Sequence, residues 1–378
     1  MNIGEPRRDE PAYDFPILAE ETEDALDELH ARARTDYETW KREFLKWLYY
    51  EGRNPARQRG YSDHTIRATT YKVDQIMRWL WNQRGYTTEL TPDDADDLMQ
   101  QLGRYSDYGD ANLNTFVKVI KRIFKFYNHE RGKNIEWDCD IELNEPNVTN
   151  RDYFYKEEFR PLYEASLGYG TVRHYNACTP AERDAIKAHL AQRFEKPKDE
   201  IAPDDFQKAN TFKIPSLVSV TLDCGLRPIE VERAKTGWIN FNDRTLDIPK
   251  EESSKNEDNW KCVLSDKSIR ALDTWIEERE LYDRYNGTDA LWLNKRGNPY
   301  NSNSLNTILS RIKAEAGIEP AGRDLTWYSI RHGVATVWVD EENLHDAREQ
   351  LRHKKIETTL GYAHSNHRNR HDVINSKW

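Results

Sequence analysis

The chain has 378 residues and a net charge of −10, and 37% of its residues are hydrophobic. That length suggests two domains, and an aromatic content of 11% is too high for a disordered chain. No apolar run approaches the ~18 residues of a membrane-spanning helix, and the N-terminal residues do not resemble a signal peptide. We therefore expect a cytoplasmic protein without a membrane partner. The acidic balance also excludes a protein that coats nucleic acid by bulk charge.

Charge is distributed unevenly along the chain. Residues 1–35 carry a net charge of −6 and form an acidic lead-in that is expected to be partly helical from Thr22. Residues 36–133 carry a net charge of +3, and the remaining residues carry −7. Apolar periodicity and helix-start signals predict that the positive segment is a small helical domain. Its helices are expected at 36–50, at 62–84, from Thr91 onward and at 110–130.

The last of these helices carries a basic stripe that is separate from its apolar face. A solvated surface is the usual explanation of such a stripe. Because it lies in the one positive segment of an acidic chain, contact with DNA phosphates is an equally good interpretation. The stripe consists of Lys118, Lys121, Arg122 and Lys125.

The rest of the chain is predicted to form a linker and a second domain. Residues 134–150 are polar and contain Pro146, which indicates a linker, and the second domain is expected at 151–378. Short β signals at 238–241, 245–248 and 260–264 stand among helical patterns, the last of which lie at 265–280, 302–316, 325–339 and around 346–352. The expected fold class is mainly α with a small β-sheet. The polar stretch 168–210 has no functional explanation.

Common catalytic and metal-binding motifs are missing from the sequence. It has no P-loop, no GxGxxG, no HExxH and no GxSxG, and its four cysteines form no CxxC pair. The spacing of His364, His367 and His371 is metal-like, but a solvated or DNA-facing tail explains it better. The acidic run at 93–97 begins a helix, where the helix dipole accounts for it. We expect no metal and no cofactor.

Four ordered segments carry the strongest functional signal. Gly-Leu-Arg-x-x-Glu lies at 225–230, Ser-Ser-Lys-Asn at 253–256, and Ile-Arg-His-x-x-Ala-Thr at 330–336. The closing segment at 351–364 holds His353, two threonines and Tyr362. In order, spacing and local sequence, these segments resemble the tyrosine recombinase family, also called phage integrases, which includes the Xer recombinases. The acidic balance further resembles recombinases of salt-loving archaea.

The resemblance implies a fold, a substrate and an assembly. Residues 36–133 would be the family's core-binding, SAM-like domain, and 151–378 its mixed α/β catalytic domain. Together they would form a C-shaped clamp on double-stranded DNA in the nucleoid, with no small-molecule substrate. Dimers on an inverted-repeat site and tetramers in the synapse are implied. The tail at 363–378 would dock onto a neighbouring protomer through Trp378.

The residue types in these segments suit attack on a DNA phosphate. A tyrosine hydroxyl is a plausible covalent nucleophile, and in-line attack places negative charge on the non-bridging oxygens. Two arginine forks can bind that charge bidentately and remain protonated, and one such donor is typically worth ~3 kcal/mol. A lysine whose pKa is lowered by neighbouring cations can protonate the leaving oxygen. Neither a metal nor ATP is then required.

The resemblance also implies a role for each site residue. Arg227 and Arg331 would grip the scissile phosphate, and His353 would donate to it. Tyr362 would attack and leave a 3′-phosphotyrosyl intermediate. Two further residues would support the site from behind: Glu230, which orients Arg227, and His332, next to Arg331.

Two positions are interpreted less directly. Lys255 would be the general acid, preferred to Lys250 and Lys261 because Ser-Lys-Asn before the turn looks most like the family hairpin. Where the family usually has histidine three residues before the second arginine, this chain has Tyr328, preceded by Trp327. A phenol can hydrogen-bond a phosphate oxygen, but a pKa of ~10 makes it a poor base. Other groups would then carry the acid–base work, or the enzyme would be slower, and simple packing is the alternative for Tyr328.

The sequence therefore favours a site-specific recombinase of the integrase and excisionase type, and two alternatives stay open. A type IB topoisomerase shares the residue set and would relax supercoils without a specific site. A DNA-binding protein that has lost catalysis would account for Tyr328. The sequence does not distinguish integration from excision or from the resolution of chromosome dimers.

Overall fold

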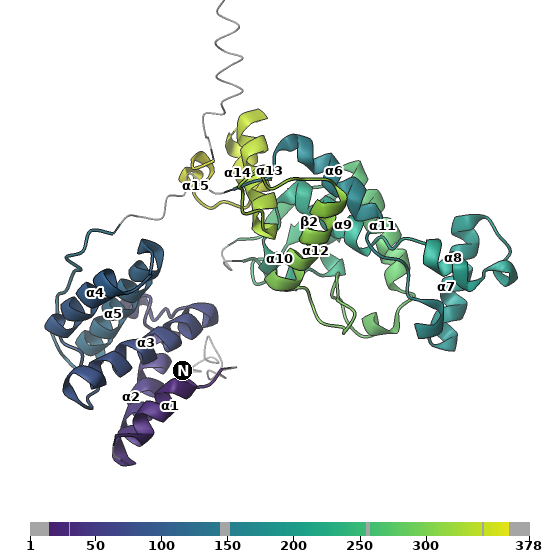
Figure 1. The fold of residues 1–378 in the computed structure, drawn as a ribbon. Helices are drawn as coiled ribbons and strands as arrows, with labels where there is room; N and C mark the ends of the chain where they lie inside the picture. The colour runs from purple at the N-terminus through teal and green to yellow at the C-terminus, as the bar shows by residue number, and fades with distance from the viewer. Residues whose placement is uncertain (1–14, 30, 144–151, 255–257, 342–343, 363–378) are drawn as a thin grey trace, which may run out of the picture. The chain divides into compact units, whose positions relative to one another are not determined.

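The computed structural model describes residues 15–29, 31–143, 152–254, 258–341 and 344–362. The chain forms two compact units, at 1–147 and 148–378. Helices dominate both units, and a three-stranded sheet lies in the second (Figure 1). The expected fold class is thus confirmed. Among the described residues, no helix is long and apolar enough to cross a membrane.

The first unit is a helical bundle around an aromatic-rich core. The start signals read from the sequence form as expected: Ser62 accepts a hydrogen bond from the backbone of Thr65, and Thr91 and Asp94 cap each other reciprocally. The elements of this unit are α1 (Glu20–Asp27), α2 (Ala31–Tyr50), the 3-10 turn η1 (Pro55–Arg57), α3 (Asp63–Arg84), α4 (Pro92–Tyr105) and α5 (Asp110–Glu130).

The helical unit extends beyond the predicted limits of 36 and 133 in both directions. On one side, Leu18 and Leu26 of the acidic lead-in are buried in its core. On the other, the first part of the predicted linker packs on the same core, and Trp137 donates a hydrogen bond to Asp96 over 2.8 Å. The predicted limits were based on net charge. The flanking acidic segments nevertheless belong to the unit, because their widely spaced apolar side chains pack on its core.

A buried ion pair lies inside the helical unit. The Lys41 ammonium and the Asp74 carboxylate are both fully buried and contact each other directly. Asp74 also accepts hydrogen bonds from the Tyr37 hydroxyl, over 2.7 Å, and from the backbone N–H of Ala19, over 2.8 Å. Burial lowers the pKa of Lys41 to about 8, although Asp74 opposes this shift. The carboxylate thus ties the lead-in, α2 and α3 together.

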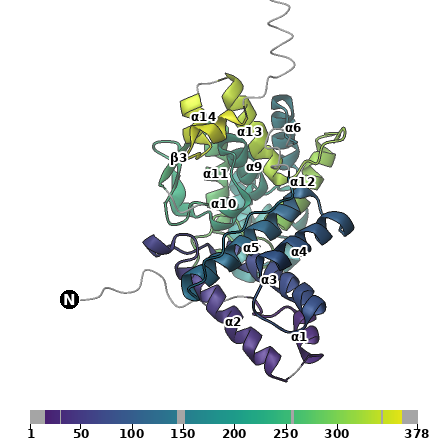
Figure 2. The ribbon, with the colours of Figure 1, turned by 90° about the vertical axis from the view of Figure 1, so that its left-hand side faces the viewer.

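The second unit is built around the apolar helix α9 (Lys213–Cys224). Helices α6 (Lys156–Leu167), α11 (Asp266–Arg279) and α13 (Trp327–Glu341) pack against it, as Figures 1 and 2 show. Its remaining helices are α7 (Pro180–Phe194), α8 (Pro203–Lys208), α10 (Pro228–Arg233), α12 (Ser302–Glu315), α14 (Leu344–Gln350) and α15 (Ile356–Leu360), with 3-10 turns at Tyr175–Ala177, Lys198–Glu200, Thr236–Trp238 and Asp283–Tyr285.

The sheet of the second unit consists of β1 (Ile239–Asn240), β2 (Thr245–Ile248) and β3 (Trp260–Val263), all antiparallel in the order β1-β2-β3. Leu246 pairs with Cys262 across β2 and β3, and both are buried. These strands occupy the three β segments predicted from the sequence.

The polar stretch 168–210 forms a small subdomain. A β-bridge between Thr171 and Asn210 closes it at its base, and α7 begins with a capping box at Thr179 and Glu182. Glu182 is buried and accepts a hydrogen bond from the backbone of Asp283, which anchors the subdomain to the rest of the unit. In Figure 1, α7 and α8 lie at the opposite end of this unit from α14 and α15.

Candidate active site

The first predicted arginine lies where α9 ends and α10 begins. Gly225 ends α9 in the left-handed conformation, with φ of 57°, and so turns the chain. Arg227 is the N-cap residue of α10, and its guanidinium and backbone N–H both donate to Glu230, over 2.9 and 2.8 Å. The side chain of Arg227 stays 15% exposed, so its remaining N–H groups can reach a ligand.

The second predicted arginine lies on α13 and is almost fully buried. Arg331 donates to the carbonyl of Gly225 over 2.7 Å and also to the carbonyl of Leu351. Burial, reinforced by the neighbouring guanidiniums of Arg227 and Arg352, lowers the pKa of Arg331 to about 9. The group still remains protonated near neutral pH.

Glu230 is the single carboxylate among these guanidiniums in the described part of the site. Burial on its own would raise the pKa of Glu230, but Arg352, Arg227 and Arg331 outweigh it and lower the pKa to about 2. Glu230 is therefore ionised at any working pH. It touches two arginines, so the predicted role behind Arg227 describes only half of its contacts.

Arg352, for which the sequence predicted no role, makes more side-chain hydrogen bonds than any other described residue of the site. Its guanidinium donates to both carboxylate oxygens of Glu230, over 2.9 and 3.4 Å, and to the carbonyl of Gly225, over 3.0 Å. It also donates to the carbonyl of Cys224, over 2.7 Å. The one available signal was its place immediately before His353 in the closing segment.

An aromatic run leads from α13 to the predicted nucleophile. The ring of Tyr328 meets that of His332 edge-on at 4.8 Å, and the His332 ring lies 5.4 Å from that of Tyr362. Tyr362 also stacks on His353, with centroids 5.6 Å apart and planes within 7°. His353 is buried, and its Nδ1 lies 3.0 Å from the Thr359 hydroxyl. The structure thus brings the half-buried Tyr362 next to two histidines.

The predicted general acid lies outside the described residues. Lys255 belongs to the β2–β3 connection, of which residues 255–257 are not described. Of its two competitors, Lys261 is exposed and pairs with Asp247 over 3.5 Å, and Lys250 is exposed at the start of the connection. The tail at 363–378, which includes His364, His367 and His371, also lies outside the described residues.

The basic stripe of α5 is divided between solvent and internal contacts. Lys118 is exposed, and the exposed Lys121 pairs with Asp138 over 2.5 Å. Arg122 donates to the Thr69 hydroxyl over 2.8 Å and packs on the ring of Tyr61, 4.7 Å from its centroid. Lys125 donates to the carbonyls of Gly52 and Arg53. Half of the predicted DNA-binding stripe therefore serves packing within the unit.

A second basic surface, which the sequence analysis missed, lies beside the stripe. The arginine loop, residues 52–60, contains no acidic residue, and its three arginines are all exposed. Within the described part of the chain, none of the three pairs with a carboxylate. The loop is closely packed, because a Cβ on Gly60 would lie 1.6 Å from the carbonyl oxygen of Tyr49, and Asn54 and Arg59 form a β-bridge within it. The three arginines are Arg53, Arg57 and Arg59.

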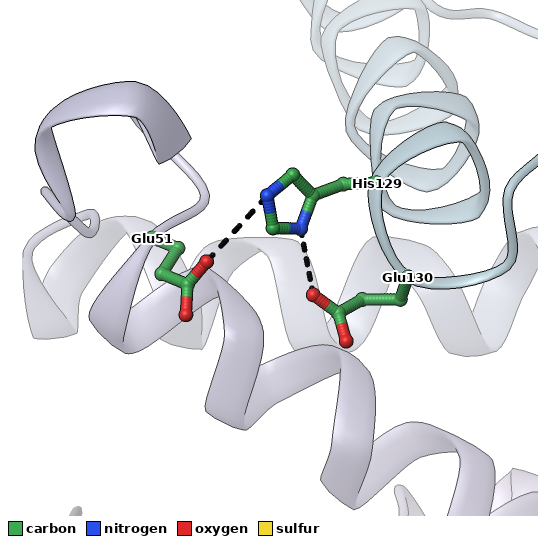
Figure 3. Close-up of side chains that lie close together, drawn as sticks. All are labelled: Glu51, His129 and Glu130. Atoms are coloured by element: carbon green, nitrogen blue, oxygen red, sulfur yellow. Dashed lines mark hydrogen bonds and ion pairs between the residues drawn. The ribbon is translucent and has the colours of Figure 1, made fainter.

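Among the described residues, one group of side chains is placed so that it could hold a metal ion, and it lies outside the catalytic unit. His129 contacts Glu51 over 3.7 Å and Glu130 over 2.6 Å, as Figure 3 shows. The indole N–H of Trp47 lies 3.1 Å from the Nδ1 that faces Glu130, so this nitrogen already has a protein partner. The group is best described as a polar link between the ends of α2 and α5.

The fold and the site together define a class of protein. Three guanidiniums and one carboxylate meet in the same unit as a tyrosine whose ring contacts two histidines, and this unit is mainly helical with a small sheet. Such a cluster has the parts for covalent phosphoryl transfer to tyrosine: a nucleophile, fixed cations and proton carriers.

Residues 201–369 match the model of the phage integrase family. Residues 201–369 therefore form a phage integrase, or tyrosine recombinase, domain, as the motifs of this segment indicated. No curated protein sequence matches the chain.

Solved recombinase structures share the fold. The chain is similar to XerH site-specific recombinase bound to a palindromic difH substrate, with 16% identity and a TM-score of 0.55, over 87% of this chain and 84% of that one. The Tn1549 transposon integrase with circular intermediate DNA gives 14% identity and a TM-score of 0.54, over 85% and 96%. A lambda integrase dimer on a COC′ core site gives 14% and 0.51, over 87% and 96%.

Proposed function

We propose that this protein is a site-specific DNA recombinase that breaks and rejoins duplex DNA through a 3′-phosphotyrosyl intermediate. One observation carries the proposal: residues from separate motifs meet at one site. Arg227 and Arg331 come together around Glu230 and Gly225, and His353 stacks on Tyr362. Family membership supports the same reaction.

The chemistry follows from the charges and the nucleophile. The Oη of Tyr362 bonds to the phosphorus as the bond to the 5′-oxygen breaks, and a general acid gives that oxygen its proton. Arg227 and Arg331 bear the charge that builds on the non-bridging oxygens. Because the phosphotyrosine bond replaces the phosphodiester bond, rejoining reverses these steps and needs neither ATP nor a metal.

The two histidines beside Tyr362 take the acid–base work that the family's usual histidine would perform at position 328. The rings of His332 and His353 both contact the Tyr362 ring, and an imidazole nitrogen can act as the base that accepts the phenolic proton. Tyr328 packs edge-on against His332, and its hydroxyl serves as a phosphate contact. Lys255 is the general acid for the leaving oxygen.

The DNA partner is a duplex that both units contact. In the helical unit, the exposed arginine loop and Lys118 and Lys121 of the stripe supply cations for the backbone. The structurally similar recombinases were solved with DNA, one of them as a dimer on its core site, which supports dimers and tetramers on DNA here. The protein acts in the cytoplasm at the nucleoid.

Covalent trapping tests the proposal. Duplexes recovered by selection from random sequence are incubated with the parent protein, and adducts that survive denaturant are counted. The parent should form adducts and Tyr362→Phe none, with binding changed by no more than a few-fold, because only the hydroxyl is removed. Tyr163→Phe on α6 is the matched control and should keep parental adduct levels. A Tyr362→Phe protein that still forms adducts would overturn the assignment.

Adduct trapping together with a relaxation assay separates the alternatives. A type IB topoisomerase would relax supercoiled DNA that lacks the selected site, whereas the proposed recombinase forms adducts at that site. A DNA-binding protein without catalysis would bind the selected duplex and give no parental adduct.

A further inference from the structure

Arg352 differs from the other two arginines of the site in having no N–H group to offer a ligand. Its Nε and Nη2 donate to Glu230 and Gly225, and its Nη1 lies 2.7, 2.8 and 3.0 Å from the carbonyls of Cys224 and Gln350 and from the Sγ of Cys262. An arginine has five N–H donors, and all of these nitrogens are engaged inside the protein. Arg352 therefore acts on other protein groups.

We propose that Arg352 is a positioning residue that holds the two phosphate-binding arginines in their catalytic geometry. It shares the Glu230 carboxylate with Arg227 and the Gly225 carbonyl with Arg331. One guanidinium thus fixes an acceptor of each catalytic arginine. The inference rests on the proposed recombinase function.

The backbone at this position supports a functional reason for the arginine. Arg352 has φ of 57°, in the left-handed region that glycine adopts most readily. A non-glycine residue there is strained and persists where its surroundings hold it in place. The buried hydrogen bonds of the guanidinium hold the backbone of Arg352 in this conformation. The next residue along the chain is His353.

The charge of the cluster gives a second reason. Three guanidiniums and one carboxylate leave an excess of two positive charges, which matches the two negative charges present when the deprotonated tyrosine oxygen attacks the singly charged phosphodiester. Without Arg352, Glu230 would have one direct guanidinium partner, Arg227. That pairing would turn Arg227 away from the substrate, so the chemical step would suffer more than DNA binding.

Arg352→Gly tests this role because glycine suits the backbone while the guanidinium is removed. Cleavage of the selected duplex in a single turnover should slow on the order of 10²-fold, the size of a small misplacement of catalytic groups. The dissociation constant for DNA should change by less than about threefold. Guanidinium ion should restore part of the rate and ammonium ion should not, because only the fork reaches both acceptors. Arg348→Gly, at a half-buried arginine of α14 that pairs with Glu349, is the matched control.

The titration of Glu230 gives a readout that does not depend on activity. Arg227, Arg331 and Arg352 face this carboxylate, and the Cys262 thiol lies on the far side of Arg352. In Arg352→Gly the pKa of Glu230, followed by carbon NMR, should rise by at least one unit, because burial is then opposed by fewer cations.

The outcomes are distinct. Parental cleavage in Arg352→Gly, an unshifted Glu230, or loss of DNA binding in step with cleavage would each overturn the positioning role. A parent protein that forms no adduct would instead overturn the recombinase proposal, and the Glu230 titration would still decide the contact made by Arg352.

Discussion

The two units bury ionised groups in opposite ways. In the helical unit, the Lys41 ammonium is matched by the Asp74 carboxylate, whose remaining lone pairs accept from Tyr37 and Ala19. In the catalytic unit, one carboxylate faces three guanidiniums. A balanced buried pair satisfies itself and serves the fold, whereas a cluster with excess positive charge is complete only when an anion enters.

Breaking the balanced pair should give the largest change. Asp74→Asn leaves the Lys41 ammonium buried without its counter-charge, which should cost about 3–5 kcal/mol of the free energy of unfolding of the helical unit. Amide protection measured by hydrogen exchange should fall in α2 and α3 and stay at parental levels in α9 and α13. The exposed Asp107→Asn is the control. Equal loss of protection in both units would contradict the separate roles of the two charge clusters.

Removing a charge from the unbalanced cluster should instead affect chemistry. Arg331→Ala should lower the rate of adduct formation by on the order of 10²–10³, as loss of a charge-stabilising donor does. Arg331→Lys should not restore the rate, because lysine lacks the planar fork. Arg279 is also largely buried and donates to the carbonyls of Thr288 and Ala290, so Arg279→Lys should keep the parental rate. A fully active Arg331→Lys protein would contradict the role of the fork.

The dependence of stability on pH below neutrality tests the contribution of the Glu230 carboxylate. The pKa of Glu230 is about 2 in the folded protein and 4.5 when exposed, so its stabilisation is complete above pH 4.5 and is lost as pH falls through 2. That difference corresponds to about 3 kcal/mol. Urea unfolding should show the advantage of the parent over Glu230→Gln shrinking between pH 6 and pH 3. The same comparison with the exposed Glu277→Gln should show no such change, and a constant advantage of the parent would contradict the shift.

The smallest effects should come from the surface cations of the helical unit. Each phosphate contact contributes about 0.9 to the slope of log affinity against log salt, so replacing the three arginines of the arginine loop by alanine should flatten it by at most ~2.7. Lys118→Ala with Lys121→Ala should flatten it by at most ~1.8, and Lys125→Ala should leave it unchanged. Preference among sites should hold, since phosphate contacts carry no sequence information. Arg34→Ala is the control and should leave the slope unchanged. Unchanged slopes for both the arginine-loop and the stripe variants would mean that DNA binds another face of the helical unit.

The sequence by itself determined the parts of this protein that depend on neighbouring residues. Ser62, Thr91 and Thr179 begin helices because a side chain caps a backbone group three residues away. The order and spacing of the motifs around Arg227, Arg331, His353 and Tyr362 were enough to indicate the family, which the family match confirmed. The assigned role of each of these residues stays a prediction.

Only the tertiary structure decided which charged side chains meet. Arg352 and Glu230 are 122 positions apart, and no local pattern shows that they share a buried hydrogen bond. In the same way, α5 periodicity placed Arg122 and Lys125 on the basic stripe, yet Thr69 and the carbonyls of the arginine loop bind them within the unit. A cap or an amphipathic face is set over a few residues, whereas the partner of a long cationic side chain depends on which distant segment the core brings within reach.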